Sequence, residues 1–220
     1  MTVQKSALVF GATGLIGGHL LRKLLDSPTY DKVTAVVRRD MGIKHPKLTV
    51  LLADLQSINN VKEQLIATDI FCCLGTTRKK TPDLQDYYRI DHDYPVTAAT
   101  LSKENGAQAF LLVSAVGANA SSSNFYLRMK GETERDISTV GFEKLHIFRP
   151  SLLTGQRREA RWMEKLSEGL LAIVNPLLMG RWKRYRSIPA AIVARAMYLA
   201  AQKDTKGSHI HYGNEMRNIT

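Results

Sequence analysis

The chain has 220 residues, a length that suits one α/β domain over residues 1–220, with about residues 150–220 forming an elaboration on the substrate side. Hydrophobic residues make up 44% and charged residues 23%, a balance that excludes an intrinsically disordered protein. The net charge of +11 raises nucleic acid as a partner, but the basic residues are spread along the chain without a helix-turn-helix pattern, so we expect none.

Short apolar runs alternate with helical runs along the chain, which is typical of parallel strands joined by crossover helices. The predicted strands are residues 7–10, 33–37, 48–52, 70–74, 109–114, 145–148 and 209–212. The predicted helices are residues 15–25, 60–66, 91–105, 161–174 and 190–201, with one more that follows an N-cap at Ser123 or Asn124. Gly106 is placed to end the helix at 91–105. The sequence therefore predicts a Rossmann-type doubly wound parallel sheet with helices on both faces.

The composition also bears on compartment. No apolar run approaches the ~20 residues needed to cross a bilayer, and the first residues lack the pattern of a signal peptide. Cys72 and Cys73 are neighbours on a predicted strand, so they point to opposite faces and are poorly placed to pair. We therefore expect reduced core cysteines, a cytoplasmic location and no membrane partner.

A glycine-rich turn connects the first strand to an amphipathic helix. The spacing of Gly11, Gly14 and Gly17 differs by one position from the dinucleotide fingerprint but depends on the same physics. The first glycine permits a tight turn, the second lets the backbone approach a pyrophosphate, and the third lets the helix pack closely on the strand. The helix N-terminus then faces the phosphate. The residues predicted to bind cofactor here are Gly11, Thr13, Gly14, Leu15, Ile16 and Gly17.

The end of the second strand indicates which dinucleotide binds. NAD-binding folds place an acidic residue here for the ribose hydroxyls, but this chain has Arg38 and Arg39, with no acid before Asp40. A guanidinium suits a 2′-phosphate, so we predict NADP(H) rather than NAD(H). After the third strand, Asp54 is expected to accept from the adenine amino group while Leu55 packs on the ring. The loop expected to run beside the cofactor after the fourth strand consists of Leu74, Gly75, Thr76 and Thr77.

Tyr126 and Lys130 place a phenol and an ammonium four residues apart on one helix face. A neighbouring cation stabilises a phenolate, and this brings a tyrosine towards the pKa range needed for reversible proton transfer. Ser114 ends the fifth strand at the same edge of the sheet, where its hydroxyl is expected to hold a substrate carbonyl. The order of the motifs predicts a serine–tyrosine–lysine site.

At these residues the sequence resembles the atypical branch of the short-chain dehydrogenase/reductase superfamily, and it is similar to the Tat-interacting-protein type of oxidoreductase. The matching segments are the glycine turn and residues 33–39, 71–78, 121–134 and 148–153. The resemblance implies that Ser114 orients the carbonyl, Tyr126 is the general acid/base, and Lys130 lowers the tyrosine pKa and holds the nicotinamide ribose. It also implies that the nicotinamide pocket is lined by Pro150, Leu152 and Leu153.

Two positions depart from the family pattern. Many members carry an asparagine in the turn after the fourth strand, and this chain does not. The helix that often supplies a further catalytic asparagine has Asp91 and Asp93 instead. The sequence thus predicts an NADP(H)-dependent oxidoreductase that reduces a carbonyl by hydride transfer. Its expected partner is a small-molecule carbonyl or alcohol substrate, and it is expected to act as a monomer or homodimer. The alternative is a cofactor-binding sensor or interaction protein, whereas paired arginines disfavour a methyltransferase.

Two further features are set aside. The six histidines show no metal-ligand spacing, so we predict no metal. The apolar stripe of helix 161–174, flanked by Trp162 and Trp182, is interpreted as core or dimer contact. The basic cluster, Arg181, Lys183, Arg184 and Arg186, is interpreted as a solvated face that would favour an anionic substrate if it covered the pocket.

Overall fold

The structure is a computed structural model, and it describes residues 4–154 and 184–219. Seven parallel strands form one sheet in the order β3-β2-β1-β4-β5-β6-β9. The strands are β1 (Lys5–Phe10), β2 (Tyr30–Val37), β3 (Leu48–Leu52), β4 (Asp69–Cys72), β5 (Ala109–Val113), β6 (Lys144–Arg149) and β9 (Gly207–Tyr212). The strand order reverses between β1 and β4, and ligands of such sheets bind outside the carboxyl ends of the strands at that point.

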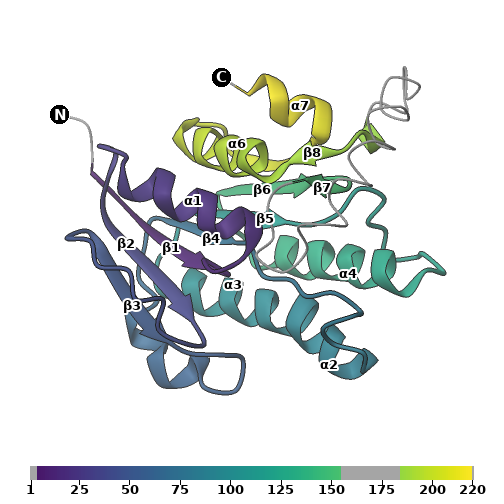
Figure 1. Ribbon diagram of the computed structural model, residues 1–220, viewed down its shortest axis with the longest axis horizontal. Coiled ribbons are helices and arrows are strands. Elements are labelled where there is room, and N and C mark those ends of the chain that lie inside the picture. Colours follow the sequence, from purple (N-terminus) through teal and green to yellow (C-terminus); the bar gives the residue numbers. More distant parts are fainter. Residues whose placement is uncertain (1–3, 155–183, 220) are drawn as a thin grey trace.

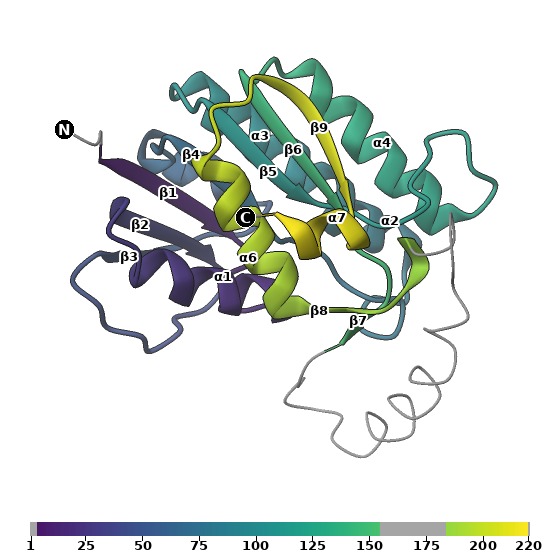
Figure 2. The ribbon, with the colours of Figure 1, turned by 90° about the horizontal axis from the view of Figure 1, so that it is seen from above.

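Helices cover both faces of the sheet (Figure 1). On one face lie α1 (Leu15–Leu25) and α6 (Ala190–Gln202), with α7 (Gly213–Asn218) packed against α6. Figure 2 shows α1 and α6 side by side across the strands. The other face carries the 3₁₀-helix η1 (Ile58–Gln64), α3 (Tyr94–Glu104) and α4 (Phe125–Thr139). The predicted Rossmann-type doubly wound sheet is confirmed.

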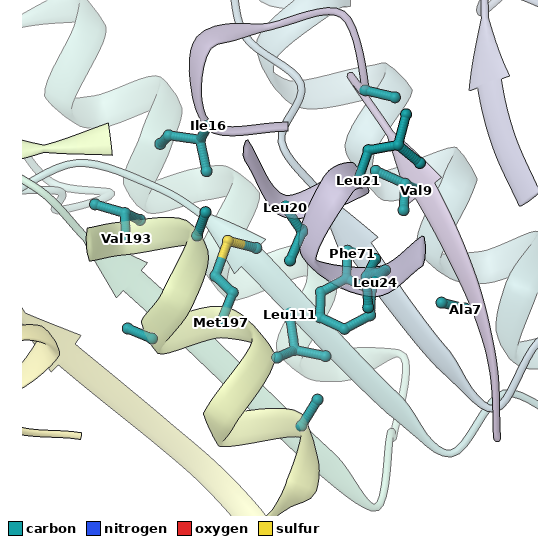
Figure 3. Close-up of a cluster of buried hydrophobic side chains, with 14 of the residues drawn as sticks. Ala7, Val9, Ile16, Leu20, Leu21, Leu24, Phe71, Leu111, Val193 and Met197 are labelled. Atoms are coloured by element: carbon teal, nitrogen blue, oxygen red, sulfur yellow. The ribbon is translucent and has the colours of Figure 1, made fainter. Parts of the chain in front are cut away.

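The larger core lies between α1, α6 and the sheet (Figure 3). Ile16, Leu20 and Leu24 recur every four residues on α1, so they share the helix face that packs on the strands. Phe71 of β4 and Met197 of α6 are fully buried opposite them. This packing fixes the start of α1, and with it the glycine turn, against the ends of β1 and β4.

The helix predicted over residues 91–105 begins earlier than expected. A continuous helical run starts with α2 (Leu84–Tyr88), passes through the π-helix η2 (Arg89–Asp93) and continues as α3. Asp83 caps the run, because its side chain accepts from the backbone N–H groups of Gln85 and Asp86 at 2.8 and 2.9 Å. π-Helical turns are rare in proteins, and those that occur often lie at functional sites.

Other boundaries differ by a few residues, and some short elements were not predicted. β4 and β5 each end earlier than expected, so Ser114 lies just beyond its strand. The unpredicted elements are α7 and the two-stranded parallel sheet of β7 (Leu153–Thr154) and β8 (Ile188–Pro189). The predicted helix at 161–174 lies outside the described residues, as do Trp162, Trp182, Arg181 and Lys183.

Cys72 and Cys73 are both free thiols on opposite faces of the sheet, as the sequence predicts. Cys72 belongs to the core beneath α3, and Cys73 packs against the core beneath α1 and α6. Within residues 4–154 and 184–219, no helix is long and apolar enough to cross a membrane.

Candidate functional site

The glycine turn is shaped by two contacts that exclude side chains. Gly11 has a φ of +79°, and a Cβ on it would lie 2.5 Å from the carbonyl oxygen of Cys73 at the end of β4. A Cβ on Gly17 would lie 2.1 Å from the carbonyl oxygen of Gly11. The backbone N–H of Gly14 closes the turn by donating to Gly11 at 2.9 Å. The three glycines therefore permit the approach of α1 to the strand ends that a dinucleotide fold requires.

The N-terminus of α1 fits a phosphate. Gly14 is the N-cap residue, no side chain caps the helix, and its first turn carries no acidic residue. Thr13 and Gly14 are exposed at this end, whereas Ile16 is buried in the core. Uncapped N–H groups at a helix N-terminus attract an anion, so the turn suits the pyrophosphate of a dinucleotide.

Arg38 and Arg39 directly follow β2 at the carboxyl edge of the sheet, and both are exposed. The carboxylate of Asp40, the next residue, accepts a hydrogen bond from the backbone N–H of Gly42 at 3.0 Å. Two guanidiniums thus stand where NAD-binding folds place an acid for the ribose.

Asp54 and Leu55 follow β3, where an adenine site is expected. Asp54 Oδ1 accepts three hydrogen bonds, from the backbone N–H groups of Gln56 and Ser57 and from the Ser57 hydroxyl, at 2.7 to 3.1 Å. These bonds, led by the one from the Ser57 hydroxyl, hold the pKa of Asp54 below its usual range. Asp54 thereby shapes the turn into η1, and only its Oδ2 accepts no bond from the described residues. Leu55 packs partly buried against the core.

The loop at residues 74–77 is tied to the helical run below it. The backbone N–H of Thr76 donates to Asp91 Oδ2 at 2.7 Å, and a Cβ on Gly75 would lie 3.4 Å from Asp91 Oδ1. The hydroxyls of Thr76 and Thr81 are 2.9 Å apart and share a hydrogen bond. The predicted cofactor loop is therefore fixed by Asp91, a residue that the sequence analysis noted only as a departure from the family.

The structure brings Tyr126 and Lys130 together on α4, whose first turn is capped by Asn124 as predicted. Lys130 is 5% exposed, and its Nζ lies 2.8 Å from Asp91 Oδ1. Tyr126 is 37% exposed, and its ring stacks on Tyr87 of α2 with 6.3 Å between ring centroids. A half-exposed phenol thus stands beside a buried ion pair at the edge of the sheet where the cofactor loop runs.

Burial raises the pKa of Tyr126 above its usual value, Lys130 lowers it, and Asp91 raises it again. Lys130 acts in the direction that the resemblance implies, but burial and the paired carboxylate outweigh it. The pKa of Lys130 is itself raised: burial disfavours the ammonium, but Asp91, Tyr126 and Cys72 together more than offset that effect. The phenol is therefore protonated at neutral pH.

Ser114 is buried, and its hydroxyl donates to the carboxylate of Glu134. Glu134 in turn forms an ion pair with Arg149, whose guanidinium also donates to the Tyr212 hydroxyl at 3.1 Å. Glu134 lies two helical turns beyond Tyr126, about 12 Å along α4. The Ser114 hydroxyl proton is thus engaged in the hydrogen bond to Glu134, so in this conformation Ser114 cannot donate to a substrate carbonyl. Its role in holding one stays a prediction.

The segment at 150–153, expected to line the nicotinamide pocket, crosses the carboxyl edge beyond β6. The carbonyl of Pro150 accepts from Val116 at 2.9 Å, and that of Leu152 accepts from Ile188 at 3.0 Å. Pro150 is buried, Leu152 is 58% exposed, and Leu153 belongs to β7. Of the basic cluster, Arg184 lies over the Tyr185 ring at 5.1 Å, and Arg186 accepts from the Ser151 hydroxyl through its carbonyl.

Comparison with known proteins identifies the family. A family described as NAD(P)H-binding matches residues 11–167, more than half of the chain. The chain belongs to this NAD(P)H-binding family. Its relatives include Protein HTATIP2 of Rattus norvegicus, 33% identical over 198 residues that cover 88% of this chain and 80% of that protein. Protein FMP52, mitochondrial, of Saccharomyces cerevisiae is 37% identical over 161 residues, covering 71% and 69% respectively. The predicted resemblance to atypical short-chain dehydrogenases/reductases is confirmed.

Solved structures confirm the fold. MoeE5 in complex with UDP-glucose and NAD superposes with a TM-score of 0.69 at 19% identity, covering 96% of this chain and 79% of that chain. A UDP-glucose 4-epimerase from Thermotoga maritima, solved with UDP-glucose, gives a TM-score of 0.68 at 16% identity and covers 97% and 80%. Together with the family, these neighbours support a nicotinamide dinucleotide as the cofactor without distinguishing NADP from NAD.

The expected cytoplasmic location is wrong, because it conflicts with the names of the related proteins. The relatives from Saccharomyces cerevisiae, Candida albicans and Aspergillus fumigatus are named as mitochondrial proteins. The features behind the expectation, two reduced cysteines and an unremarkable N-terminal sequence, do not distinguish one reducing compartment from another.

Proposed function

We propose that the protein is an NADP(H)-dependent oxidoreductase that reduces the carbonyl group of a small molecule. The observation that carries the proposal is the half-exposed Tyr126 beside the buried Lys130–Asp91 pair. We further propose that it works as a monomer or homodimer, without a nucleic-acid or membrane partner.

The cofactor would be held by residues at the carboxyl edge of the sheet. The glycine turn and the first turn of α1 would bind the pyrophosphate, and Arg38 and Arg39 would bind the 2′-phosphate. Asp54 and Leu55 would take the adenine, and the segments at 74–77 and 150–153 would flank the nicotinamide. When bound, the nicotinamide supplies a hydride to the carbonyl carbon.

Tyr126 would donate its hydroxyl proton to the carbonyl oxygen as that oxygen gains negative charge. Its raised pKa keeps it in the protonated form that donation requires. Lys130 would then stabilise the phenolate until solvent restores the proton, and it would hold the nicotinamide ribose. Ser114 would assist only if its hydroxyl left Glu134 for the substrate, so we expect Ser114→Ala to lower turnover much less than Tyr126→Phe.

A second candidate is a cofactor-binding sensor or interaction protein. The commitment of Ser114 to Glu134 favours this candidate, because a reductase of this class uses that hydroxyl on the substrate. A partner that binds only one cofactor state, together with no turnover across a panel of aldehydes and ketones, would support the sensor.

The cofactor assignment is tested by titrating the protein with NADPH and NADH and following nucleotide fluorescence. We expect NADPH to bind at least tenfold more tightly than NADH, and Arg38→Ala with Arg39→Ala to remove that difference. Arg22→Ala, an exposed arginine in the last turn of α1, is the matched control and should change neither affinity. Equal affinities in the unmodified protein would contradict the choice of NADP(H). If neither nucleotide bound, the glycine turn would serve only the packing of the fold.

The chemistry is tested with Tyr126→Phe, which should lower turnover at least a hundredfold and leave NADPH affinity unchanged. Tyr88→Phe is the control, because the Tyr88 hydroxyl donates to Glu132 at 3.1 Å, away from the Lys130–Asp91 pair. Turnover that survives in Tyr126→Phe at the level of Tyr88→Phe would refute the mechanism.

A further inference from the structure

Asp91 is a buried carboxylate next to the predicted catalytic residues, and the sequence analysis gave it no role in the site. It is 1% exposed and projects from the π-helix η2. One carboxylate oxygen lies 2.8 Å from Lys130 Nζ, and the other accepts from the Thr76 N–H at 2.7 Å. Its carbonyl accepts from the Thr133 hydroxyl of α4 at 3.1 Å. A single residue thus joins the cofactor loop, the helical run and the helix that carries Tyr126.

This arrangement changes the charge that Tyr126 experiences. A lone Lys130 would present a full positive charge to the phenol and stabilise the phenolate. A carboxylate at hydrogen-bond distance makes the pair neutral, and it is buried, so water screens neither partner. An asparagine at this position would supply the same hydrogen-bonding shape without the charge.

We propose that Asp91 is a positioning residue that fixes Lys130 and the loop at 74–77 and keeps Tyr126 in the protonated form that carbonyl reduction requires. This inference rests on the proposed function for its consequence in turnover, but the electrostatic effect of Asp91 on Tyr126 can be measured without turnover.

The other titratable groups that act at this site are Tyr87, Cys72 and Arg78. Burial, with Asp91 and Tyr126 adding to it, raises the pKa of Tyr87 to about 12. Burial also raises the pKa of the Cys72 thiol of β4 to about 12. Arg78 acts on Tyr87 from the loop after β4 and lowers the pKa of that tyrosine. The experiment below therefore reads the ring signal of Tyr126 itself.

The direct test is an NMR titration of protein labelled with ¹³C at the tyrosine ring carbon that bears the hydroxyl, with Tyr126 assigned by the signal lost in Tyr126→Phe. In the unmodified protein we expect the Tyr126 midpoint to lie above about 10, the ordinary value for tyrosine. In Asp91→Asn we expect it to fall by about one pH unit or more, because one negative charge is removed near the ring. A midpoint below the ordinary value in the unmodified protein would overturn the proposal, even if Asp91→Asn did not fold.

Two control variants separate charge from loosening of the fold. Thr133→Val removes the bond to the Asp91 carbonyl without changing charge, and Asp93→Asn removes a neighbouring carboxylate that pairs with His92 at 2.8 Å. Both should leave the Tyr126 midpoint in place. A shift in Thr133→Val equal to that in Asp91→Asn would mean that Asp91 acts only through structure.

The consequence for turnover is read from the pH profile of kcat/KM for reduction of a simple aldehyde by NADPH. Asp91→Asn should move the alkaline limb to lower pH by the same shift as the NMR midpoint, with NADPH affinity nearly unchanged. An NMR shift without any reductase activity would refute the proposed function and uphold the electrostatic role, whereas activity with an unmoved limb would refute the role and uphold the function.

Discussion

Gly17 and Gly18 stand next to each other on α1 and meet different surroundings. A Cβ on Gly17 would lie 2.1 Å from the carbonyl oxygen of Gly11, a distance that no real contact reaches. A Cβ on Gly18 would meet only the carbonyl oxygen of Ala12, at 3.6 Å, which is an ordinary contact. The same substitution at these two positions should therefore have opposite effects.

We expect Gly17→Ala to push α1 away from the glycine turn, which would lower the free energy of unfolding and weaken NADPH binding at least tenfold. Gly18→Ala is the matched control, and it should raise the free energy of unfolding by roughly 0.5–1 kcal/mol because alanine is the better helix former. Urea unfolding and fluorescence titration measure both effects. Equal behaviour of the two variants would show that the close packing of the turn does not govern the site.

At the scale of elements, three imidazoles join β6 to the edge strand β9. His146 is 2% exposed, its Nδ1 lies 3.0 Å from His211 Nε2, and its ring stacks on those of His209 and His211. Burial, with smaller contributions from the neighbouring His211 and His209, lowers the pKa of His146 to about 4. Burial also lowers the pKa of His211. His146 and His211 therefore meet between these strands as neutral imidazoles.

The unfolded chain takes up protons at His146 and His211 near the ordinary pKa of ~6.5, and the folded protein does so only at lower pH. The free energy of unfolding should thus be fully maintained above pH ~6.5 and fall as the pH drops towards 4. For His146 alone we expect a loss on the order of 2 kcal/mol between pH 7 and pH 5.

In His146→Phe this acid loss should become smaller, as measured by urea unfolding at the two pH values. His19→Gln, on α1, serves as the control and should keep the loss of the unmodified protein. An undiminished acid loss in His146→Phe would place the sensitivity elsewhere.

At the scale of the whole molecule, a polar network at the amino edge of the sheet ties the first strand to the last long helix. The buried carboxylate of Asp69 on β4 accepts from Tyr30 at 2.6 Å and pairs with Lys5 at 3.1 Å. Lys5 also donates to the Ala201 carbonyl of α6 at 2.7 Å, and Gln202 donates to the Tyr30 hydroxyl at 3.1 Å. The network joins β1, β2, β4 and α6, on the edge opposite the glycine turn.

Asp69→Ala would leave the buried Tyr30 hydroxyl without its acceptor and Lys5 without its partner, which we expect to cost about 3 kcal/mol. Because the network lies away from the cofactor edge, the NADPH affinity of the folded protein should not change. Asp31→Ala, an exposed carboxylate on β2, is the control and should alter stability by less than about 0.5 kcal/mol. Urea unfolding with and without NADPH distinguishes these outcomes; a loss of affinity in Asp69→Ala would mean that the two edges are coupled.

Much of the fold follows from local pattern in the sequence. The amphipathic pattern after the glycine turn predicted α1 with the bounds that the structure has, and a short apolar run did the same for β3. The alternation of strands and helices predicted the parallel sheet, because parallel strands need crossover connections. Such features depend on neighbours within a few residues, so the sequence states them directly. The start at Leu84 was missed, although Asp83 is a residue type that commonly caps a helix N-terminus and was a signal for it.

The pairings within the site could not be predicted in the same way. The sequence by itself determined the glycine turn, the arginines after β2 and the face shared by Tyr126 and Lys130, since each is a matter of spacing along one element. Only the tertiary structure decided that Lys130 meets Asp91 and that Ser114 donates to Glu134. These partners come from different elements, and their charges and hydroxyls pair as they do because burial removes the water that would otherwise satisfy them.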